Sequence, residues 1–384
     1  MQILFLTTVL PRNKNGGEVA SEYFIDALQQ NGYNVSVVGY FRKDDVLDKK
    51  PQEILVDQRY IETKKSKVYT IIWLIFSIIK GLPYSAAKYY SNRYIKIVKE
   101  LIDSKNYDVF IIDHAQVGWI ERFIEAKDKL VIIAHNVEHE VYGDSAKSAG
   151  SFVSKWIYKR DANLIKSIED RLAVTARQVW TIAQHDFNYF SNIKGGVGVK
   201  LLSFGLAKKS RDKPVNKTFD IGIIGSWAWR ANEEGLQWFL QTVYPLLPTD
   251  LSIHVAGHSA EWLAGKYPNI HYLGFVPDAQ EFMAQAKVVA IPTLSGSGVQ
   301  MKTLDAIASG SAIVLTPLAL RGISDYPRTV KIAEKPEDFA NLLVAAIASS
   351  SAQQAFDDMD DVLDWSRTRQ NKFIADIASA INEL

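Results

Sequence analysis

The sequence predicts an α/β protein made of two Rossmann-like domains that face each other across a cleft. Short apolar runs rich in β-branched residues alternate with longer segments whose apolar residues recur at helical spacing. This alternation occurs twice, on either side of a segment rich in glycine and lysine. The 384 residues also exceed what a single hydrophobic core usually serves. Parallel strands joined by crossover helices are the simplest arrangement for each half.

The first half shows this alternation from its first residues. The elements expected there are a strand over 3–7, a helix over 18–30, a strand over 35–39, a helix over 93–104, and strands over 109–112 and 130–134. The second strand is expected to end at Gly39, with no acidic residue after it that could bind a ribose. A nicotinamide cofactor is therefore disfavoured, and the G-x-G-x-x-G pattern is also missing.

The composition changes between residues 193 and 218, where the chain reads IKGGVGVKLLSFGLAKKSRDKPVNKT. We interpret this segment as a hinge. The elements expected after it are a strand over 221–224, a helix over 233–243, strands over 252–256 and 270–273, a helix over 279–285, a strand over 288–292, a helix over 303–309, and strands over 312–315 and 331–333. The predicted domains are 1–200, a hinge at 201–217, 218–364, and a C-terminal helix at 365–384 that could cross back to the first domain.

Composition excludes several classes of function. The 44 Lys and Arg residues nearly balance the 43 Asp and Glu residues, so no global charge attracts the chain to nucleic acid. Without cysteine there is no disulfide framework, thiolate nucleophile or Cys-ligated metal. The apolar N-terminus lacks the basic region and small-residue cleavage site of a signal peptide. We therefore expect a cytoplasmic protein.

Two glycine-containing loops are candidate phosphate sites. Gly16 and Gly17 lie between the first strand and the first helix, where peptide N–H groups and a helix N-terminus can meet an anion. A tight strand-to-helix turn explains this glycine pair equally well. The second loop, Ser295 to Gly298, enters a helix that carries Lys302 and Asp305. Its lysine is preceded by methionine rather than glycine, so a Walker A nucleotide site is excluded.

One phosphate loop in each half predicts a ligand that carries a diphosphate. The segment from Ser295 to Pro317, which contains GSGVQMKTLDAIASG, resembles the donor-binding region of the group 1, glycogen-synthase-like glycosyltransferases in their GT-B fold. The segments 225–247 and 131–142, the latter containing HNVE, resemble further parts of this family. The segment GLPYSAAKYYS at 81–91 and the order HNVE, IED, TIAQHD are similar to its bacterial sugar-transferase branch. The resemblance covers nearly the whole chain.

This resemblance implies roles for particular residues. It assigns donor binding to Gly16, Gly17, Gly225, Ser295, Gly296, Ser297, Gly298, Val299 and Asp305. It places His135 near the sugar and the acceptor, although this residue could also cap a strand end. Lys302, and less directly Arg230, would stabilise the departing diphosphate, and a solvated arginine remains an alternative for Arg230. The family usually carries two glutamates eight positions apart, where this chain has Ser297 and Asp305.

The function implied by the resemblance is transfer of a sugar from a nucleotide diphosphate to a glycan or lipid-linked acceptor, with retention, in the synthesis of cell-surface polysaccharide. The nucleotide sugar would be the co-substrate, with no other cofactor and no metal. HNVEH at 135–139 does not have the H-E-x-x-H spacing of a zinc site. Two alternatives stay open: a nucleotide-sugar 2-epimerase of the same fold, and a non-catalytic protein that binds nucleotide sugars.

A surface for the acceptor or for a membrane is suggested between Arg59 and Lys105. This segment holds ten Lys or Arg, three acids and eight interleaved aromatic residues. Its run at 69–79, YTIIWLIFSII, is the most apolar of the chain, yet at about 11 residues it falls short of the ~20 needed to span a bilayer. The segment therefore indicates either peripheral contact with an anionic membrane or a helix packed in the first domain with lysines at its rim.

Overall fold

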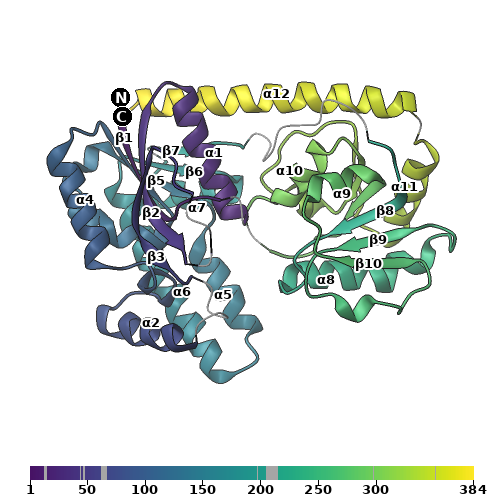
Figure 1. Cartoon of the computed structure of the whole chain (residues 1–384), viewed down its shortest axis with the longest axis horizontal. Helices are drawn as coiled ribbons and strands as arrows, with labels where there is room; N and C mark the ends of the chain where they lie inside the picture. The colour runs from purple at the N-terminus through teal and green to yellow at the C-terminus, as the bar shows by residue number, and fades with distance from the viewer. Residues whose placement is uncertain are drawn as a thin grey trace. The chain divides into compact units, whose positions relative to one another are not determined.

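The computed structural model describes residues 1–12, 15–43, 45, 48–61, 67–196, 198–204, 215–296, 298–350 and 352–384. The chain divides into two compact units. Unit 1 comprises Met1–Ser203 and Phe373–Leu384, and unit 2 comprises Phe204–Lys372. Each unit is a parallel β-sheet with helices packed against it, so the predicted fold class of two Rossmann-like α/β domains is confirmed (Figure 1). Most of the expected hinge, residues 205–214, lies outside the described residues.

Unit 1 is built on a seven-stranded sheet with the order β3-β2-β1-β4-β5-β6-β7, all pairs parallel. Its strands are β1 (Gln2–Val9), β2 (Asn34–Arg42), β3 (Glu53–Arg59), β4 (Val109–Asp113), β5 (Leu130–Ala134), β6 (Gln178–Thr181) and β7 (Val199–Leu201). The strand order reverses between β1 and β4. In a parallel sheet, this reversal opens a crevice at the carboxyl ends of the two strands.

Helices and short 3-10 segments surround this sheet (Figure 1). They are α1 (Gly16–Gln30), α2 (Lys67–Lys80), α3 (Tyr84–Ala87), α4 (Asn92–Ser104), η2 (Ala115–Phe123), η3 (Lys127–Lys129), α5 (Glu138–Ser148), α6 (Phe152–Thr175) and α7 (Gln184–Lys194). The strands are rich in Val, Ile and Leu because both faces of the sheet are covered. Residues 3–6 of β1 and 111–112 of β4 are fully buried.

Unit 2 has a six-stranded parallel sheet with the order β10-β9-β8-β11-β12-β13. Its strands are β8 (Phe219–Ile224), β9 (Ile253–Ala256), β10 (Ile270–Gly274), β11 (Ala286–Ile291), β12 (Ala312–Leu315) and β13 (Val330–Ile332). The helical segments are α8 (Arg230–Trp238), η4 (Phe239–Val243), η5 (Tyr244–Leu246), η6 (Glu261–Leu263), α9 (Ala279–Gln285), α10 (Met301–Ala308), η7 (Pro317–Leu320), α11 (Pro336–Ala348) and α12 (Ala352–Asn382). Here the order reverses between β8 and β11, which directs the loops after these strands to one crevice.

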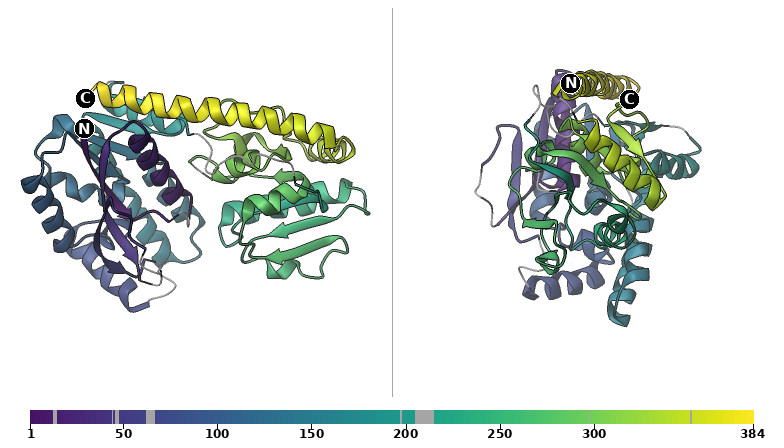
Figure 2. Two further views of the ribbon diagram at one scale, coloured as in Figure 1. Left: turned by 45° about the horizontal axis from the view of Figure 1, so that its top comes forward. Right: turned by 90° about the vertical axis from the view of Figure 1, so that its right-hand side faces the viewer.

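The long helix α12, yellow in Figures 1 and 2, contributes to both units. Within unit 1, the Phe373 ring is fully buried and lies 5.4 Å from the ring of Phe24, measured between centroids. The amide of Asn31 donates to the Ile374 carbonyl over 2.9 Å, and the amide of Gln178 donates to the Ala380 carbonyl over 2.8 Å. The end of the chain is thus part of the core of unit 1.

Some elements differ from the sequence-based expectations. β2 does not end at Gly39 but continues to Arg42, and this places a cation at the carboxyl edge of the sheet. Three short strands, β3, β6 and β7, were not anticipated because they have only three to seven residues and a mixed apolar pattern. The helix expected over 233–243 starts earlier and passes into a π turn. Among the described residues, no helix has both the length and the apolar character required to cross a membrane.

Candidate active site

A buried carboxylate organises the crevice of unit 1. Asp113 is the last residue of β4 and is fully buried. It accepts hydrogen bonds from Thr7 Oγ1 and Ser21 Oγ, each over 2.7 Å, and its other oxygen lies 2.5 Å from His135 Nε2. Burial alone would raise the pKa of Asp113, but His114, His135 and these hydrogen bonds hold it below its ordinary value. Asp113 is therefore an anion that fixes the ring of His135.

His114, the residue after Asp113, carries a second imidazole to the same place. Its backbone has a φ of 77°, a left-handed conformation that few residues other than glycine adopt. Its ring stacks on that of His135 with the centroids 3.9 Å apart, and the two planes are inclined by 15°. Burial, together with the nearby His135, lowers the pKa of His114 to about 4, so this ring is neutral at pH 7. The strained backbone marks His114 as a functional candidate.

The two histidines lie beside a pocket of about 660 Å³ at the carboxyl end of β1. Its lining residues are Thr7, Thr8, Val9, Asn15, Gly17, Glu18, Ser21, Arg42, Ile61, Lys88, Tyr89, His114 and Gln116. A Cβ atom at Gly17 would lie 3.5 Å from the His114 ring, so this glycine leaves the ring accessible beside the start of α1. Asn15 caps this helix by accepting from the N–H of Glu18, which also forms an ion pair with Arg42. Gly16 is the first residue of α1 and is exposed.

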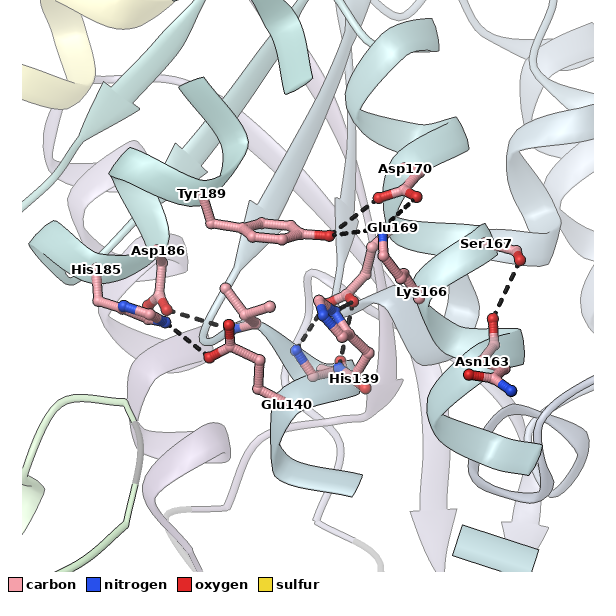
Figure 3. A network of polar contacts seen from close by, with 12 residues as sticks. His139, Glu140, Asn163, Lys166, Ser167, Glu169, Asp170, His185, Asp186 and Tyr189 are labelled. Atoms are coloured by element: carbon pink, nitrogen blue, oxygen red, sulfur yellow. Dashed lines mark hydrogen bonds and ion pairs between the residues drawn. The ribbon is translucent and has the colours of Figure 1, made fainter. Parts of the chain in front are cut away.

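The loop that carries His135 is held in place by carboxylates from two other helices. Glu169 of α6 accepts from the N–H of Glu138 over 2.6 Å and from the N–H of His139 over 3.3 Å. Asp186 of α7 accepts from the N–H of Val137 over 3.2 Å. Figure 3 shows these contacts beside the pairs of His139 with Glu169 and of Tyr189 with Asp170. The segments HNVE, IED and TIAQHD are therefore parts of one polar network.

In unit 2, the glycine-containing loop follows β11 and leads into α10. Gly296 and Gly298 have φ values of 116° and 73°, which a residue with a side chain rarely adopts. The hydroxyl of Ser295 donates to Glu234 of α8 over 2.8 Å, and the other oxygen of Glu234 accepts from Arg230 over 2.6 Å. Arg230 is itself 62% exposed. It therefore contacts the loop only indirectly, through Glu234.

Two cations lie beside this loop. Lys302, the second residue of α10, donates to the side-chain oxygen of Asn232 over 2.9 Å. Burial, with Arg321 nearby, lowers the pKa of Lys302 to about 8. Arg321 donates to the carbonyl of Gly298 over 2.6 Å and to the carbonyl of Gly296. The acceptor of the Lys302 hydrogen bond is the neutral side-chain amide of Asn232, so this bond does not neutralise the charge of the amine.

The remaining predicted donor residues have different surroundings. Asp305 follows Lys302 by about one turn of α10, which puts both side chains on the same side of the helix. The side chain of Val299 packs against Gly322, where an added Cβ would approach it to 2.5 Å. Gly225 lies directly after β8, and a Cβ there would be 3.1 Å from the ring of Trp227. Ser297 lies outside the described residues.

Comparison with known proteins agrees with this geometry. Residues 218–349 match the family described as "Glycosyl transferases group 1". This match, together with the fold, supports a group 1 glycosyltransferase. No curated protein sequence gives a match. As a glycosyltransferase, the protein is an enzyme that transfers a glycosyl group, and the matched region contains the whole loop from Ser295 to Lys302 and the helix α10.

Solved glycosyltransferase structures share the fold over the full length. Sucrose-phosphate synthase from Thermosynechococcus elongatus superposes with a TM-score of 0.61 at 15% identity, over 99% of this chain and 95% of that one. HepE of Anabaena, solved with UDP and glucose, gives 0.61 at 12% identity over 100% of both chains. Trehalose 6-phosphate synthase from Burkholderia multivorans gives 0.58 at 10% identity, over 100% of this chain and 98% of that one. These likenesses establish the GT-B fold of the glycosyltransferase.

Three residues were not predicted from the sequence, two in the pocket region of unit 1 and one at the glycine-containing loop of unit 2. Asp113 and His114 follow β4, and their position at the carboxyl end of a strand was the available signal. Arg321 comes from a loop after η7, so nothing in the sequence near residue 298 indicated it. Lys302 and Asp305, which were predicted, share one helix, and His135 lies in the other unit.

One group of side chains in the described part of the chain has a spacing that could hold a metal ion. Asp113, His114 and His135 each offer one ligand atom, and the three atoms lie within 4.8 Å of one another. Asp113 already accepts from Thr7, Ser21 and His135. This bonding suits a carboxylate that orients an imidazole. In HNVEH the second histidine, His139, pairs with Glu169 and is not part of this group.

Proposed function

We propose that this glycosyltransferase moves a sugar from a nucleotide diphosphate to a glycan or lipid-linked acceptor, with retention, in the synthesis of cell-surface polysaccharide. The observation that carries the proposal is the partly buried amine of Lys302 beside the glycine-containing loop after β11. A buried cation bonded to an amide oxygen is costly unless an anion binds to it. A diphosphate at the start of α10 supplies that anion.

The donor diphosphate would bind to the amine of Lys302 and to peptide N–H groups of the loop. The positive φ values of Gly296 and Gly298 allow the backbone to approach a phosphate closely. Arg321 positions this loop because its guanidinium donates hydrogen bonds to the carbonyls of Gly296 and Gly298. Asp305, on the same side of α10 as Lys302, would accept hydrogen bonds from the ribose. HepE, of the same fold, was solved with UDP and glucose, which supports a nucleotide sugar as the donor.

In the proposed reaction, the acceptor hydroxyl attacks the anomeric carbon from the face that the diphosphate leaves. The bond between the anomeric carbon and the diphosphate oxygen breaks, the new glycosidic bond forms, and the hydroxyl proton moves to the departing diphosphate. The protein then acts by positioning the reactants and by stabilising the leaving group. His135, oriented by Asp113, and the neutral ring of His114 would contact the sugar and the acceptor.

We also propose that the nucleotide sugar is the only co-substrate and that no metal is required. The charge of Lys302 replaces a divalent cation at the diphosphate in this proposal. Asp113 already accepts hydrogen bonds from Thr7, Ser21 and His135, which favours an orienting role for this carboxylate over metal coordination. We propose a cytoplasmic location for the same reason, because the donor in this proposal is a nucleotide sugar.

The test is a turnover assay of the purified protein with a panel of nucleotide sugars and acceptors, analysed by mass spectrometry, with and without EDTA. Lys302→Met is expected to lower kcat by a factor of ~10² to 10³, as loss of a charged transition-state contact does. Lys217→Met is the matched control, because burial also lowers the pKa of Lys217 to about 8 while its amine bonds Ala284 and Ser311.

Four outcomes would contradict the proposal. Isomerised free nucleotide sugar without acceptor would identify an epimerase. Donor binding without any product would identify a binding protein. Equal turnover of the Lys302 variant and the control would remove the assigned role of Lys302, and loss of activity in EDTA that Mg²⁺ restores would show a required metal.

A further inference from the structure

The helix α2 exposes an apolar face that none of the described residues of unit 1 covers. Its side chains point outward at i, i+3, i+4 and i+7 spacing, and Ile71, Ile79 and Val68 are 61, 71 and 69% exposed. The complete set on this face is Val68, Ile71, Ile72, Ile75, Ile78 and Ile79. On the opposite side, Trp73 and Ser77 are buried against unit 1. A helix that is apolar all round and yet exposed on one side marks a binding surface.

The start of α6 carries a second group of exposed apolar side chains. Phe152, Val153 and Trp156 are 85, 65 and 53% exposed. Arg160, two turns further on, donates to the Ser77 hydroxyl over 2.8 Å and to the Ser77 carbonyl over 3.0 Å, which ties α6 to α2. The exposed aromatic residues lie on the same side of α6 as Arg160, and Figure 1 shows the two helices together in unit 1. We name the exposed residues of α2 and of the start of α6 the apolar face.

Basic side chains outnumber acidic ones beside the apolar face in the sequence. Residues 63–80 contain Lys64, Lys65, Lys67 and Lys80, and no Asp or Glu. Residues 144–161 contain Lys147, Lys155, Lys159 and Arg160, together with Asp144 and Asp161, which pair with Lys147 and Arg160. Lys80, Lys155 and Lys159 are exposed. The whole chain has a net charge of only +1, so this excess of positive charge is local.

We propose that the apolar face docks unit 1 onto the surface of a membrane that contains anionic lipids. The isoleucines of α2 and the aromatic residues of α6 enter the boundary between headgroups and acyl chains, and the lysines contact lipid phosphates. Trp156 and Tyr158 suit this boundary because each combines an apolar ring with a polar group. The helix lies on the bilayer and does not cross it, as its 14 residues require.

Charge distinguishes this occupant from a second copy of the chain. In a symmetric dimer, the same patch of each subunit meets its equivalent, so the lysines around one apolar face would approach those around the other. Juxtaposed like charges disfavour such an interface. An anionic bilayer is complementary to both the apolar face and its basic rim.

The proposal goes beyond the proposed function, since binding to lipid is measured without donor or acceptor. It also agrees with the lipid-linked acceptor. The short helix α3 and the following residues Lys88 and Tyr89 connect α2 to the pocket beside His114. An acceptor anchored in the bilayer would then lie on the same unit as this pocket.

The test is flotation of the full-length protein with vesicles of phosphatidylcholine, with or without phosphatidylglycerol, at low and high salt. We expect the wild type to float with the anionic vesicles and to bind less at high salt. Ile75→Glu/Ile79→Glu should lower the partition coefficient at least about tenfold, and Lys155→Ala/Lys159→Ala should lower it several-fold and weaken its salt dependence. The control is Val174→Glu/Ile332→Glu, which changes residues 69 and 40% exposed outside the apolar face.

Folding is checked for each variant by its melting temperature and by its turnover of a soluble donor. Three results would overturn the proposal: no flotation of the wild type with either vesicle, equal flotation of the Ile75/Ile79 variant and the control, or a dimer of the wild type that Ile75→Glu/Ile79→Glu converts to monomer without any vesicle binding. If the wild type floats with anionic vesicles but has no glycosyltransferase activity, the membrane-binding proposal holds although the proposed function fails.

Discussion

Lys302 combines a cost in stability with the role proposed for it in binding the donor diphosphate. Its folded-state pKa of about 8 lies below the ordinary value because burial removes water from the amine, and Arg321 adds to the effect. The unfolded chain therefore holds this proton more tightly than the folded one. By this linkage, the contribution of Lys302 to stability increases as the pH rises from about 8 towards its unfolded pKa. An amine that destabilises the folded protein at neutral pH is typical of a binding site.

The charge of Lys302 predicts how nucleotide affinity depends on pH. Below about pH 8 the amine is protonated, and UDP affinity should be nearly constant. Above that pH the affinity should fall by up to about tenfold per pH unit, because the cation that meets the diphosphate is lost. Lys302→Arg should abolish the fall, since a guanidinium stays charged. Calorimetric titration between about pH 7 and pH 9 measures this, and the same fall in the arginine variant would contradict it.

Among the elements, α5 depends on another helix for its N-terminal cap. Its own cap residue, Val137, has no side-chain oxygen, and the carboxylate of Glu169 from α6 accepts from the first N–H groups instead. This anion also suits the positive end of the helix dipole. Burial, together with the charge of Glu169, raises the pKa of Glu138 to about 8, so Glu138 is mostly protonated at neutral pH. The cap and the loop of His135 are therefore one structural unit.

Removal of this cap should affect both stability and catalysis. Glu169→Ala leaves two buried N–H groups without an acceptor, and we expect a loss of about 2 kcal/mol in the free energy of unfolding. It should also lower kcat more than it raises KM, because the loop positions His135. Glu169→Gln, which keeps one acceptor oxygen, should recover part of both. Denaturant titration and steady-state kinetics are the measurements.

The matched control is Glu140→Ala, since Glu140 is exposed and its partner His185 is exposed too. An exposed pair contributes little, and the free energy of unfolding should change by less than about 1 kcal/mol. If both alanine variants lost equal stability, Glu169 would have no special role as the cap of α5.

At the scale of the whole molecule, the last residues of the chain complete the core of unit 1. Phe373, Ile377 and Ile381 are buried, and the backbone of this segment accepts hydrogen bonds from Asn31 and Gln178. Unit 1 thus needs residues from both ends of the sequence. A domain expressed without residues 373–384 would expose the apolar surface around Phe24.

Phe373→Ala should destabilise unit 1 more than unit 2. Loss of a fully buried phenylalanine typically costs ~3 to 5 kcal/mol through lost contacts and the cavity that remains. Hydrogen exchange followed by mass spectrometry should show faster exchange in β1, β5 and β6, with β8 to β12 little changed. Phe275→Ala, at a position 65% exposed in unit 2, is the control. Equal acceleration in both units would contradict the assignment of this segment to unit 1.

Local patterns in the sequence determined much of this protein. The alternation of apolar strands and amphipathic helices predicted the two parallel sheets, because strands buried on both faces must be apolar throughout. The loop from Ser295 to Gly298, with Lys302 at the start of the next helix, was predicted as a phosphate site, because a site of this kind consists of residues close together in the chain. The sequence also indicated His135 and the segments HNVE, IED and TIAQHD. It did not indicate that these three segments meet in one polar network.

Only the tertiary structure decided which distant residues meet. Asp113 and His114 reach His135 because β4 and β5 are neighbours in the sheet, and Arg321 reaches the loop at Gly298 because η7 follows the adjacent strand β12. The sequence left two environments open for the apolar run at 69–79, and the packing of α2 shows that one side is buried and the other exposed. Spacing along the chain specifies local geometry and periodicity, whereas contacts between separate elements depend on strand order and on packing, which no single segment contains.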